Sequence, residues 1–365
     1  MRRGDRTGRN GDGGEGRWSR RGLLLAAAAA GGSGLAACSA RPGPDVAAPT
    51  VTSTVTTGGP TVTVEATPPP RTVTAAPEAP PVPTLPDRPA PYEVLPGEML
   101  AACKRDAVRF LEAVMSVDDL GRDDDALAER LAPTGQDPGV ARPLLGLLPQ
   151  RGPAALRVTY PQYGGLNAEE DRASQMVLGD LLLLDGAGDL VRRPFGADVR
   201  LSRDGDRWVV TSVQPAFPDP PLPPLPGPVQ ALLEDDRVEL SGIAAADLRS
   251  GVVHESVALA LTELAARWRV RVHVLYSAHP VNVFATTRPS AHTVGRAVDV
   301  TALDGLWVVD RERAPWRAFM AAALEAGATD IGGPAELRPA ERYFTDRVHQ
   351  DHVHLGFPLP PDRRV

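Results

Sequence analysis

Between residues 97 and 217, the apolar positions repeat first with the period of a helix and then with the shorter period of β-strands. One apolar stripe indicates a helix and is formed by Val108, Leu111, Ala113, Val114 and Met115. Four later segments alternate as strands do, at residues 156–160, 175–178, 199–202 and 208–213. Gly205 separates the last two segments and indicates a hairpin. The pattern predicts a helix followed by an antiparallel sheet.

The same change of period occurs again between residue 229 and the end of the chain. Two helices are predicted from two apolar faces, one with Val257, Leu261, Leu264, Ala265 and Trp268 and one with Trp316, Phe319, Met320, Ala323 and Leu324. Pro315 opens the second helix and Gly327 follows its end. Strands are predicted at residues 270–274, 296–301 and 352–357, the first of them half-buried. These elements predict an α+β fold, with helices packed against a small and mostly antiparallel sheet.

Two proline-rich segments separate these patterned regions from each other and from the N-terminus. Residues 39–96 are rich in Pro, Thr, Val and Ala and contain few large apolar side chains. They are predicted to form a disordered tether that begins at residue 38. Eight prolines occur within residues 215–228. They predict a hinge at residues 218–228, between a first domain at residues 97–217 and a second at residues 229–365.

Residues 1–37 have the layout of an export signal. Their arginine-rich start leads into Ser19-Arg20-Arg21-Gly22-Leu23-Leu24, which resembles a twin-arginine signal, and then into a short apolar run. That run ends in Leu35-Ala36-Ala37-Cys38, which resembles the bacterial lipoprotein box. The resemblance implies that Cys38 is the lipidated first residue of a mature protein held at the outer face of the cell membrane. An ordinary secretory peptide, with Cys38 incidental, is the alternative.

Charge and cysteine content narrow the classes of function. Removing residues 1–37, which carry seven Arg and three acidic residues, changes the formal net charge from −7 to −11. Nucleic-acid binding needs clustered Lys and Arg, so a chain this acidic is not expected to bind nucleic acid. The only cysteines are Cys38 and Cys103. A lipidated Cys38 leaves Cys103 without a disulfide partner, and Cys103 is therefore predicted to be a small core residue.

All seven histidines lie in the last third of the chain. In the predicted strand that carries Asp299, the neighbouring valines point to the core and Asp299 points to the other face. A turn at Gly295 can bring His292 back over that strand. The last predicted strand carries His352 and His354, which lie two residues apart and therefore share one face.

One imidazole and one carboxylate from the first segment, with one imidazole from the last strand, would supply three nitrogen or oxygen ligands. Three such ligands, with a fourth position left for water, are typical of catalytic zinc sites. The alternative is that these are ordinary surface histidines or hydrogen-bonded core histidines.

The spacing Ser290-x-His292-x-x-Gly295-x-Ala297-x-Asp299, followed by His352-x-His354, resembles that of the zinc D-alanyl-D-alanine peptidases. This family includes D-Ala-D-Ala carboxypeptidases, dipeptidases and murein endopeptidases, and it shares its fold with the Hedgehog signalling domain. The resemblance covers roughly residues 250–358. It implies that His292, Asp299 and His354 bind Zn²⁺. It also implies that His352 is the non-ligand histidine found beside the metal in one branch of the family.

The chain departs from this family at the residue that polarises the scissile carbonyl. Many members carry an arginine after the first strand, where this chain has Tyr276-Ser277-Ala278-His279. The candidates for the missing positive charge are Arg288, Arg296 and His279. Ser290 is predicted either to orient a metal ligand by hydrogen bonding or only to cap a turn.

The resemblance implies hydrolysis of a peptide bond in the stem or cross-link peptides of peptidoglycan. His352 is expected to accept a proton and to return it to the leaving amine, and Arg288 is expected to pair with a substrate carboxylate. Carboxypeptidase and endopeptidase action both remain open. The alternative is a catalytically inactive, metal-containing lipoprotein that binds the cell wall.

The first domain resembles the NTF2-like domains of some exported bacterial proteins, because a helix is followed by a sheet that ends in a Trp208-Val209 strand. It is expected to act as a spacer or as a surface for an envelope protein partner. Serine peptidase chemistry of the Ser-x-x-Lys type is excluded, because Ala101 stands three residues before Lys104, the only lysine. Cysteine catalysis is disfavoured, because Cys103 belongs to a different domain from the histidines.

Overall fold

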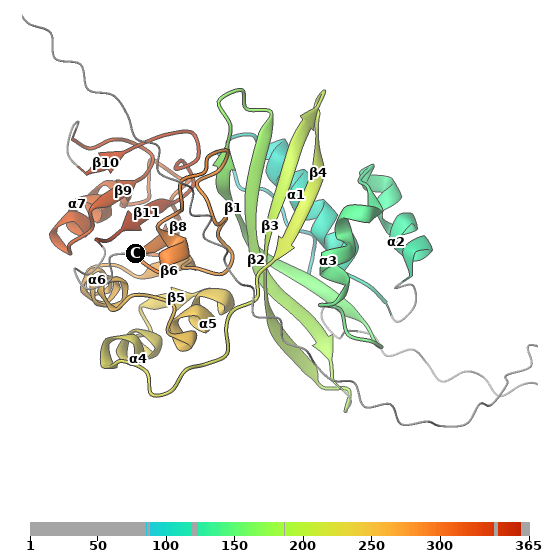
Figure 1. Ribbon diagram of the computed structural model, residues 1–365, viewed down its shortest axis with the longest axis horizontal. Helices are drawn as coiled ribbons and strands as arrows, with labels where there is room; N and C mark the ends of the chain where they lie inside the picture. Colours follow the sequence, from blue (N-terminus) through green and yellow to red (C-terminus); the bar gives the residue numbers. More distant parts are fainter. Residues whose placement is uncertain (1–84, 86–87, 119–122, 186, 339–341, 359–365) are drawn as a thin grey trace, which may run out of the picture. The chain divides into compact units, whose positions relative to one another are not determined.

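The computed structural model describes residue 85 and residues 88–118, 123–185, 187–338 and 342–358. By its internal contacts the chain divides into Met1–Ala76 and Pro77–Val365, and every described residue belongs to the second unit. The predicted export signal, Cys38 and most of the predicted tether lie outside the described residues. Within these residues two sheets and several helices form the α+β fold that the sequence predicts (Figure 1).

The first region of this unit, residues 88–215, is built on a four-stranded antiparallel sheet in the order β1-β2-β3-β4. Its strands are β1 (Ala154–Leu166), β2 (Arg172–Leu184), β3 (Leu190–Asp204) and β4 (Arg207–Pro215). The four predicted strands are confirmed, and so is the hairpin at Gly205, whose φ of 61° suits glycine. The strands are longer than the alternating segments predicted.

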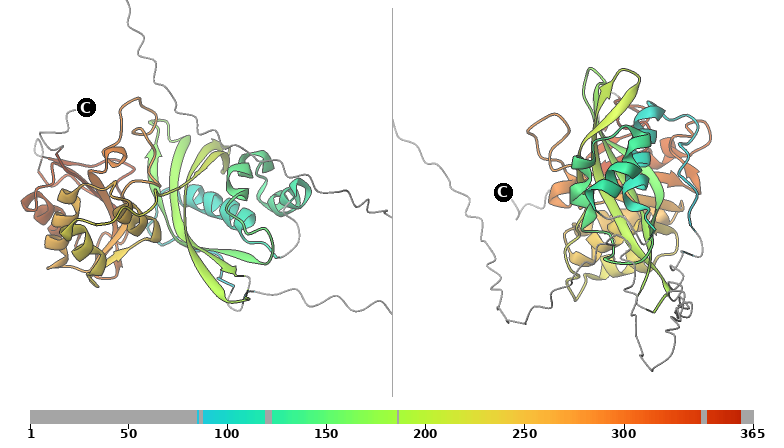
Figure 2. Two further views of the ribbon diagram at one scale, coloured as in Figure 1. Left: turned by 60° about the horizontal axis from the view of Figure 1, so that its bottom comes forward. Right: turned by 90° about the vertical axis from the view of Figure 1, so that its right-hand side faces the viewer.

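The helices of the first region cover one face of this sheet (Figure 2). They are α1 (Ala101–Met115), α2 (Asp124–Leu131) and α3 (Arg142–Leu145), with short 3-10 turns η1 (Ala132–Thr134) and η2 (Pro138–Ala141) between α2 and α3. Helix α1 confirms the first predicted helix, and its buried face packs with the sheet into one apolar core. Cys103 is fully buried in that core, as predicted. Tyr92, from the end of the predicted tether, packs against the same core.

The second region, residues 227–357, contains a mixed sheet in the order β10-β9-β11-β7-β6-β5, with β8 paired to β7. Its strands are β5 (Val238–Leu240), β6 (Val270–Val274), β7 (Ala297–Leu303), β8 (Leu306–Trp307), β9 (Asp330–Gly332), β10 (Tyr343–Phe344) and β11 (Val353–Gly356). Its helices are α4 (Gly227–Glu234), α5 (Gly242–Ser250), α6 (Glu255–Ala265) and α7 (Trp316–Glu325), with a 3-10 turn η3 (His292–Val294). Two of its strand pairs are parallel, β5 with β6 and β9 with β10, and the others are antiparallel.

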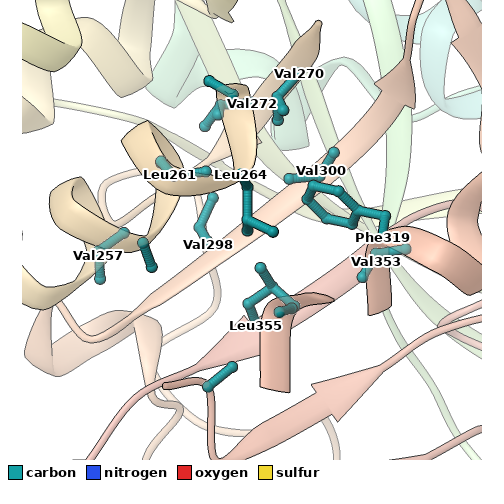
Figure 3. Packing of buried hydrophobic residues seen from close by; sticks show 14 of the residues in the cluster. Val257, Leu261, Leu264, Val270, Val272, Val298, Val300, Phe319, Val353 and Leu355 are labelled. Atoms are coloured by element: carbon teal, nitrogen blue, oxygen red, sulfur yellow. The ribbon is translucent and has the colours of Figure 1, made fainter. Parts of the chain in front are cut away.

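The second core lies between the helices and one face of this sheet (Figure 3). Leu261 and Leu264 of α6 and Phe319 of α7 meet the alternate residues of β7 and β11 there. In β11 these are Val353 and Leu355, so the histidines on either side of Val353 project to the opposite face, as the strand period predicts. Gly327, with a φ of 93°, follows the end of α7 as predicted.

The opposite face of the second sheet is also covered, which the sequence analysis did not expect. All seven residues of β7 are buried, and His273 of β6 is 1% exposed. The half-buried character predicted for residues 270–274 is therefore wrong at His273, whereas Arg271 is partly exposed as predicted. Strand β1 of the first region provides the cover, because Tyr160 contacts the rings of both His273 and Trp307. Among the described residues, no helix is long and apolar enough to cross a membrane.

Candidate functional site

Three chain segments bring the predicted ligands together on the covered face of the second sheet. The antiparallel pairing of β11 with β7 sets His354 opposite Asp299, and both side chains project to the same face. His292 begins the short turn η3, which ends at Gly295 with a φ of 68°. A side chain at position 295 would collide with the carbonyl oxygen of Val252, so only glycine allows the turn to pack there.

The three predicted ligand atoms form a small triangle. His292 Nε2 lies 3.2 Å from Asp299 Oδ1 and 3.2 Å from His354 Nδ1. His354 Nδ1 lies 2.9 Å from Asp299 Oδ1. Each of these atoms presents a lone pair when the carboxylate is charged and each imidazole is neutral with its proton on the other ring nitrogen. In that state the triangle can form one face of a coordination site.

The tautomer of His292 is set by the backbone. Its Nδ1 lies 2.8 Å from the carbonyl oxygen of Leu275, which can only accept a hydrogen bond. Nδ1 therefore carries the proton and Nε2 presents its lone pair to Asp299 and His354. A backbone carbonyl that orients a ligating histidine is a common support of metal sites, and the sequence offers no signal for it.

His279, His292 and Asp299 also form a group that could hold a metal ion, since one ligand atom of each lies within 4.8 Å of the others. The His279 and His292 rings, however, are stacked at 4.1 Å with only 10° between their planes. An imidazole binds a metal in its own ring plane, and two stacked planes cannot both contain one ion. His354 Nδ1, which lies 2.9 Å from Asp299 Oδ1 and 3.2 Å from His292 Nε2, is therefore the better third ligand. Burial, followed by the neighbouring His292 imidazole, holds the pKa of His279 well below its usual value.

His352 lies beside the triangle, and only one of its two ring nitrogens, Nδ1, is close enough to a carboxylate for a hydrogen bond. Its Nδ1 is 2.6 Å from Asp351 Oδ1, and its Nε2 is 3.8 Å from Asp299 Oδ1. Burial disfavours the charged ring, but the carboxylates of Asp299 and Asp351 outweigh burial and raise the pKa of His352. Burial lowers the pKa of His354 to about 4, which leaves its ring neutral and able to bind a metal.

A buried ion cluster lies behind Asp351. Lys104 Nζ is 2.6 Å from Asp351 Oδ2 and 2.6 Å from Glu98 Oε2. Burial disfavours the charged form of Asp351, but Lys104 and His352 lower its pKa to about 2. Burial outweighs Lys104 at Glu98 and raises the pKa of that carboxyl. The ion pair of this cluster is therefore formed by Lys104 and Asp351. The sequence pattern did not identify either residue as part of the site.

Two corners of the triangle, Asp299 and His354, line a cavity of about 430 Å³ together with His352. Arg288 lines the cavity and its side chain is exposed. Arg296 also lines it, but its Nη1 donates a hydrogen bond to the carbonyl oxygen of Phe357 and lies 3.7 Å from Asp330 Oδ2. Of the two predicted arginines, Arg288 is thus the one less engaged by its own chain. The first region supplies part of the wall, through residues 163–166.

Ser290 does not touch a ligand ring. Its hydroxyl accepts a hydrogen bond from the backbone nitrogen of His292 at 3.3 Å, and its carbonyl accepts from Thr293 Oγ1 at 2.8 Å. These contacts are those of a residue that caps a turn, which was the second of the two roles predicted for Ser290. Ser290 therefore acts on the path of the backbone into His292, while Leu275 orients the ring.

The chain matches no family model, no curated protein and no solved structure.

Proposed function

We propose that this chain is a zinc-dependent peptidase that hydrolyses a peptide bond in peptidoglycan stem or cross-link peptides. The observation that carries the proposal is the triangle formed by His292 Nε2, Asp299 Oδ1 and His354 Nδ1 at the end of a cavity. The choice of substrate rests on the resemblance of the surrounding motif to the zinc D-alanyl-D-alanine peptidases.

The spacing of the triangle fits zinc. Ligand atoms at about 2.0–2.1 Å from a tetrahedral Zn²⁺ are roughly 3.3 Å apart. The three observed separations are 3.2, 3.2 and 2.9 Å. Two imidazoles and one carboxylate also form the donor set of many catalytic zinc sites, which keep a fourth position open.

Zinc at this site would supply a Lewis acid and a nucleophile formed at neutral pH by lowering the pKa of a coordinated water. The chain itself supplies the proton carrier. Asp351 accepts a hydrogen bond from His352 Nδ1, so His352 Nε2 is the atom that takes a proton from the attacking water and returns it to the leaving amine.

Arg288 gives the cavity a cation that suits a peptide substrate with a free carboxylate. Its guanidinium is exposed, which leaves it available for a bidentate pair with a carboxylate. We place this activity at the outer face of the cell membrane, where a lipidated Cys38 would anchor the chain beside its peptidoglycan substrate.

The test begins with the metal content of the purified full chain and of His354→Ala, measured by elemental mass spectrometry. We expect about one zinc per wild-type chain and strong depletion in the variant. The two proteins are then incubated with purified muropeptides, and the products are identified by mass spectrometry. Cleavage of a stem or cross-link bond by the wild type alone supports the proposal. Zinc binding without cleavage would favour a metal-containing protein that only binds the cell wall.

A further inference from the structure

Both carboxylates of the site turn one oxygen toward the histidines and the other toward the first region. Asp299 presents Oδ1 to the ligand histidines, and its Oδ2 accepts a hydrogen bond from Gln162 Nε2 at 2.6 Å. Asp351 presents Oδ1 to His352, and its Oδ2 faces Lys104 Nζ at 2.6 Å. Gln162 and Lys104 lie in β1 and α1, far from the histidines in sequence.

Among the described residues, the side-chain amide of Gln162 forms a hydrogen bond only with Asp299. The side chain is fully buried, and its Oε1 has no hydrogen-bond partner among the described residues. Burying an unpartnered amide oxygen is unfavourable for folding. The hydrogen bond from the Gln162 amide to Asp299 compensates for this cost. It binds Oδ2 of Asp299 and so keeps Oδ1 directed at the two ligand imidazoles.

Lys104 is the only lysine of the chain and is 0% exposed. Its ammonium group contacts Asp351, Glu98 and the hydroxyl of Tyr160. It also lies over the Tyr160 ring, 4.4 Å from the centroid. A buried ion cluster contributes little net stability compared with apolar packing. The cluster around Lys104 instead fixes the rotation of the Asp351 carboxylate, and therefore the tilt of the His352 ring.

We propose that Gln162 and Lys104 are positioning residues of the metal site, so that the first region completes a site whose ligands all come from the second. The inference rests on the proposed metal site and goes beyond a spacer or partner-binding role for residues 97–217. Gln162 acts on metal binding through Asp299. Lys104 acts on the proton carrier through Asp351 and His352.

The first test replaces Gln162 by methionine in the full chain and measures zinc affinity by competition with a chromogenic chelator. We expect zinc binding weaker by about 10–100-fold, the usual effect of removing a residue that supports a ligand. The visible spectrum of the cobalt(II)-substituted protein should change as well, since Asp299 is then free to rotate. The matched control is Gln175→Met, which removes a fully buried glutamine of the same sheet whose amide faces Cys103 instead. Equal affinities and spectra for Gln162→Met and the control would overturn the role of Gln162.

The second test compares Lys104→Met with Glu98→Gln. The NMR signal of the His352 N–H proton, identified by its loss in His352→Ala, should shift or vanish in Lys104→Met and persist in Glu98→Gln. Any peptidase activity should then fall in kcat, with KM and zinc content retained. A folded Lys104→Met protein with the wild-type N–H signal would overturn the role of Lys104. If Lys104→Met does not fold, Lys104→Gln, which keeps a polar group at this position, replaces it in the same comparison.

These readouts separate the two proposals. If Gln162→Met binds zinc more weakly and the wild-type protein cleaves no muropeptide, the positioning role is supported and the peptidase is refuted. If Gln162→Met keeps the full zinc affinity and the wild-type protein cleaves muropeptides, the positioning role of Gln162 is refuted and the peptidase is supported.

Discussion

The two regions of the molecule differ sharply in the chemistry that their sequences carry. The first region has no histidine, whereas the second contains all seven. The second region builds the ligand triangle from a strand pair and a turn, which are close in its own sheet. The first region packs a helix on a sheet and turns the far edge of that sheet, β1, toward the histidines.

In our proposal, the reactive groups of the site therefore lie in one region and the residues that orient them lie in the other. The second region alone provides every candidate ligand. The first region provides polar groups that contact only the outer oxygens of the two carboxylates. Removing ligands should therefore abolish the site, and removing their supports should weaken it by degrees.

The largest effect is expected from the ligands themselves. Replacing His292 by alanine removes one corner of the triangle and leaves Asp299 with a single imidazole partner. Zinc affinity should fall by more than the roughly 100-fold upper range typical of supporting residues. Isothermal titration of the metal-free protein with zinc measures this directly. Stoichiometric zinc binding at wild-type affinity in His292→Ala would place the metal elsewhere.

The next largest effect concerns the apolar cores. Phe319→Ala in the second core and Phe110→Ala in the first each truncate a fully buried ring, which should cost about 3–5 kcal/mol of unfolding free energy. Residues 77–365 form one compact unit, so both variants should lower the same single thermal transition. Calorimetry that resolves two transitions, with each variant affecting only one, would show that the regions unfold independently.

Asp351→Asn tests the support of the proton carrier with little change in volume. The amide cannot accept from both His352 and Lys104 as the carboxylate does, so kcat should fall by about 10–100-fold with zinc content retained. Steady-state kinetics on a cleaved muropeptide provide the measurement. Asp198→Asn is the matched control, because Asp198 is a buried carboxylate bonded to Ser174 and Arg200 within the first sheet. Equal losses in both variants would point to a general effect on folding.

The smallest effect is expected at Ser290. Its hydroxyl caps the turn before His292 and contacts no ligand ring, so Ser290→Ala should cost about 1 kcal/mol of stability. Zinc affinity should change little, because the Leu275 carbonyl still orients His292. Chemical denaturation and chelator competition test the two halves of this expectation. A tenfold loss of zinc affinity with unchanged stability would restore Ser290 as a direct support of the ligand.

Much of the fold could be predicted from the sequence. The apolar stripe of α1 and the faces of α6 and α7 have clear helical periods, and most of the predicted positions are buried. The exceptions are Ala113, Trp268 and Leu324, which are only partly buried. The four strands of the first sheet were found, although their full lengths were not. Strand burial was predicted less well, because an alternating pattern shows one buried face and cannot show what covers the other, as at His273.

The sequence by itself predicted a metal site. Residue types, strand period and a glycine turn bring together His292, Asp299 and one histidine of the last strand, and all of these act over short distances along the chain. The choice of His354 rests on the resemblance to the zinc D-alanyl-D-alanine peptidases. Only the tertiary structure decided how these groups are held. Gln162 and Asp299 are 137 positions apart, and Lys104 and Asp351 are 247 apart. A polar residue in an apolar pattern signals that a partner exists, but periodicity carries no information on which distant residue it is. That choice depends on how β1 packs over the second sheet, which only the folded chain specifies.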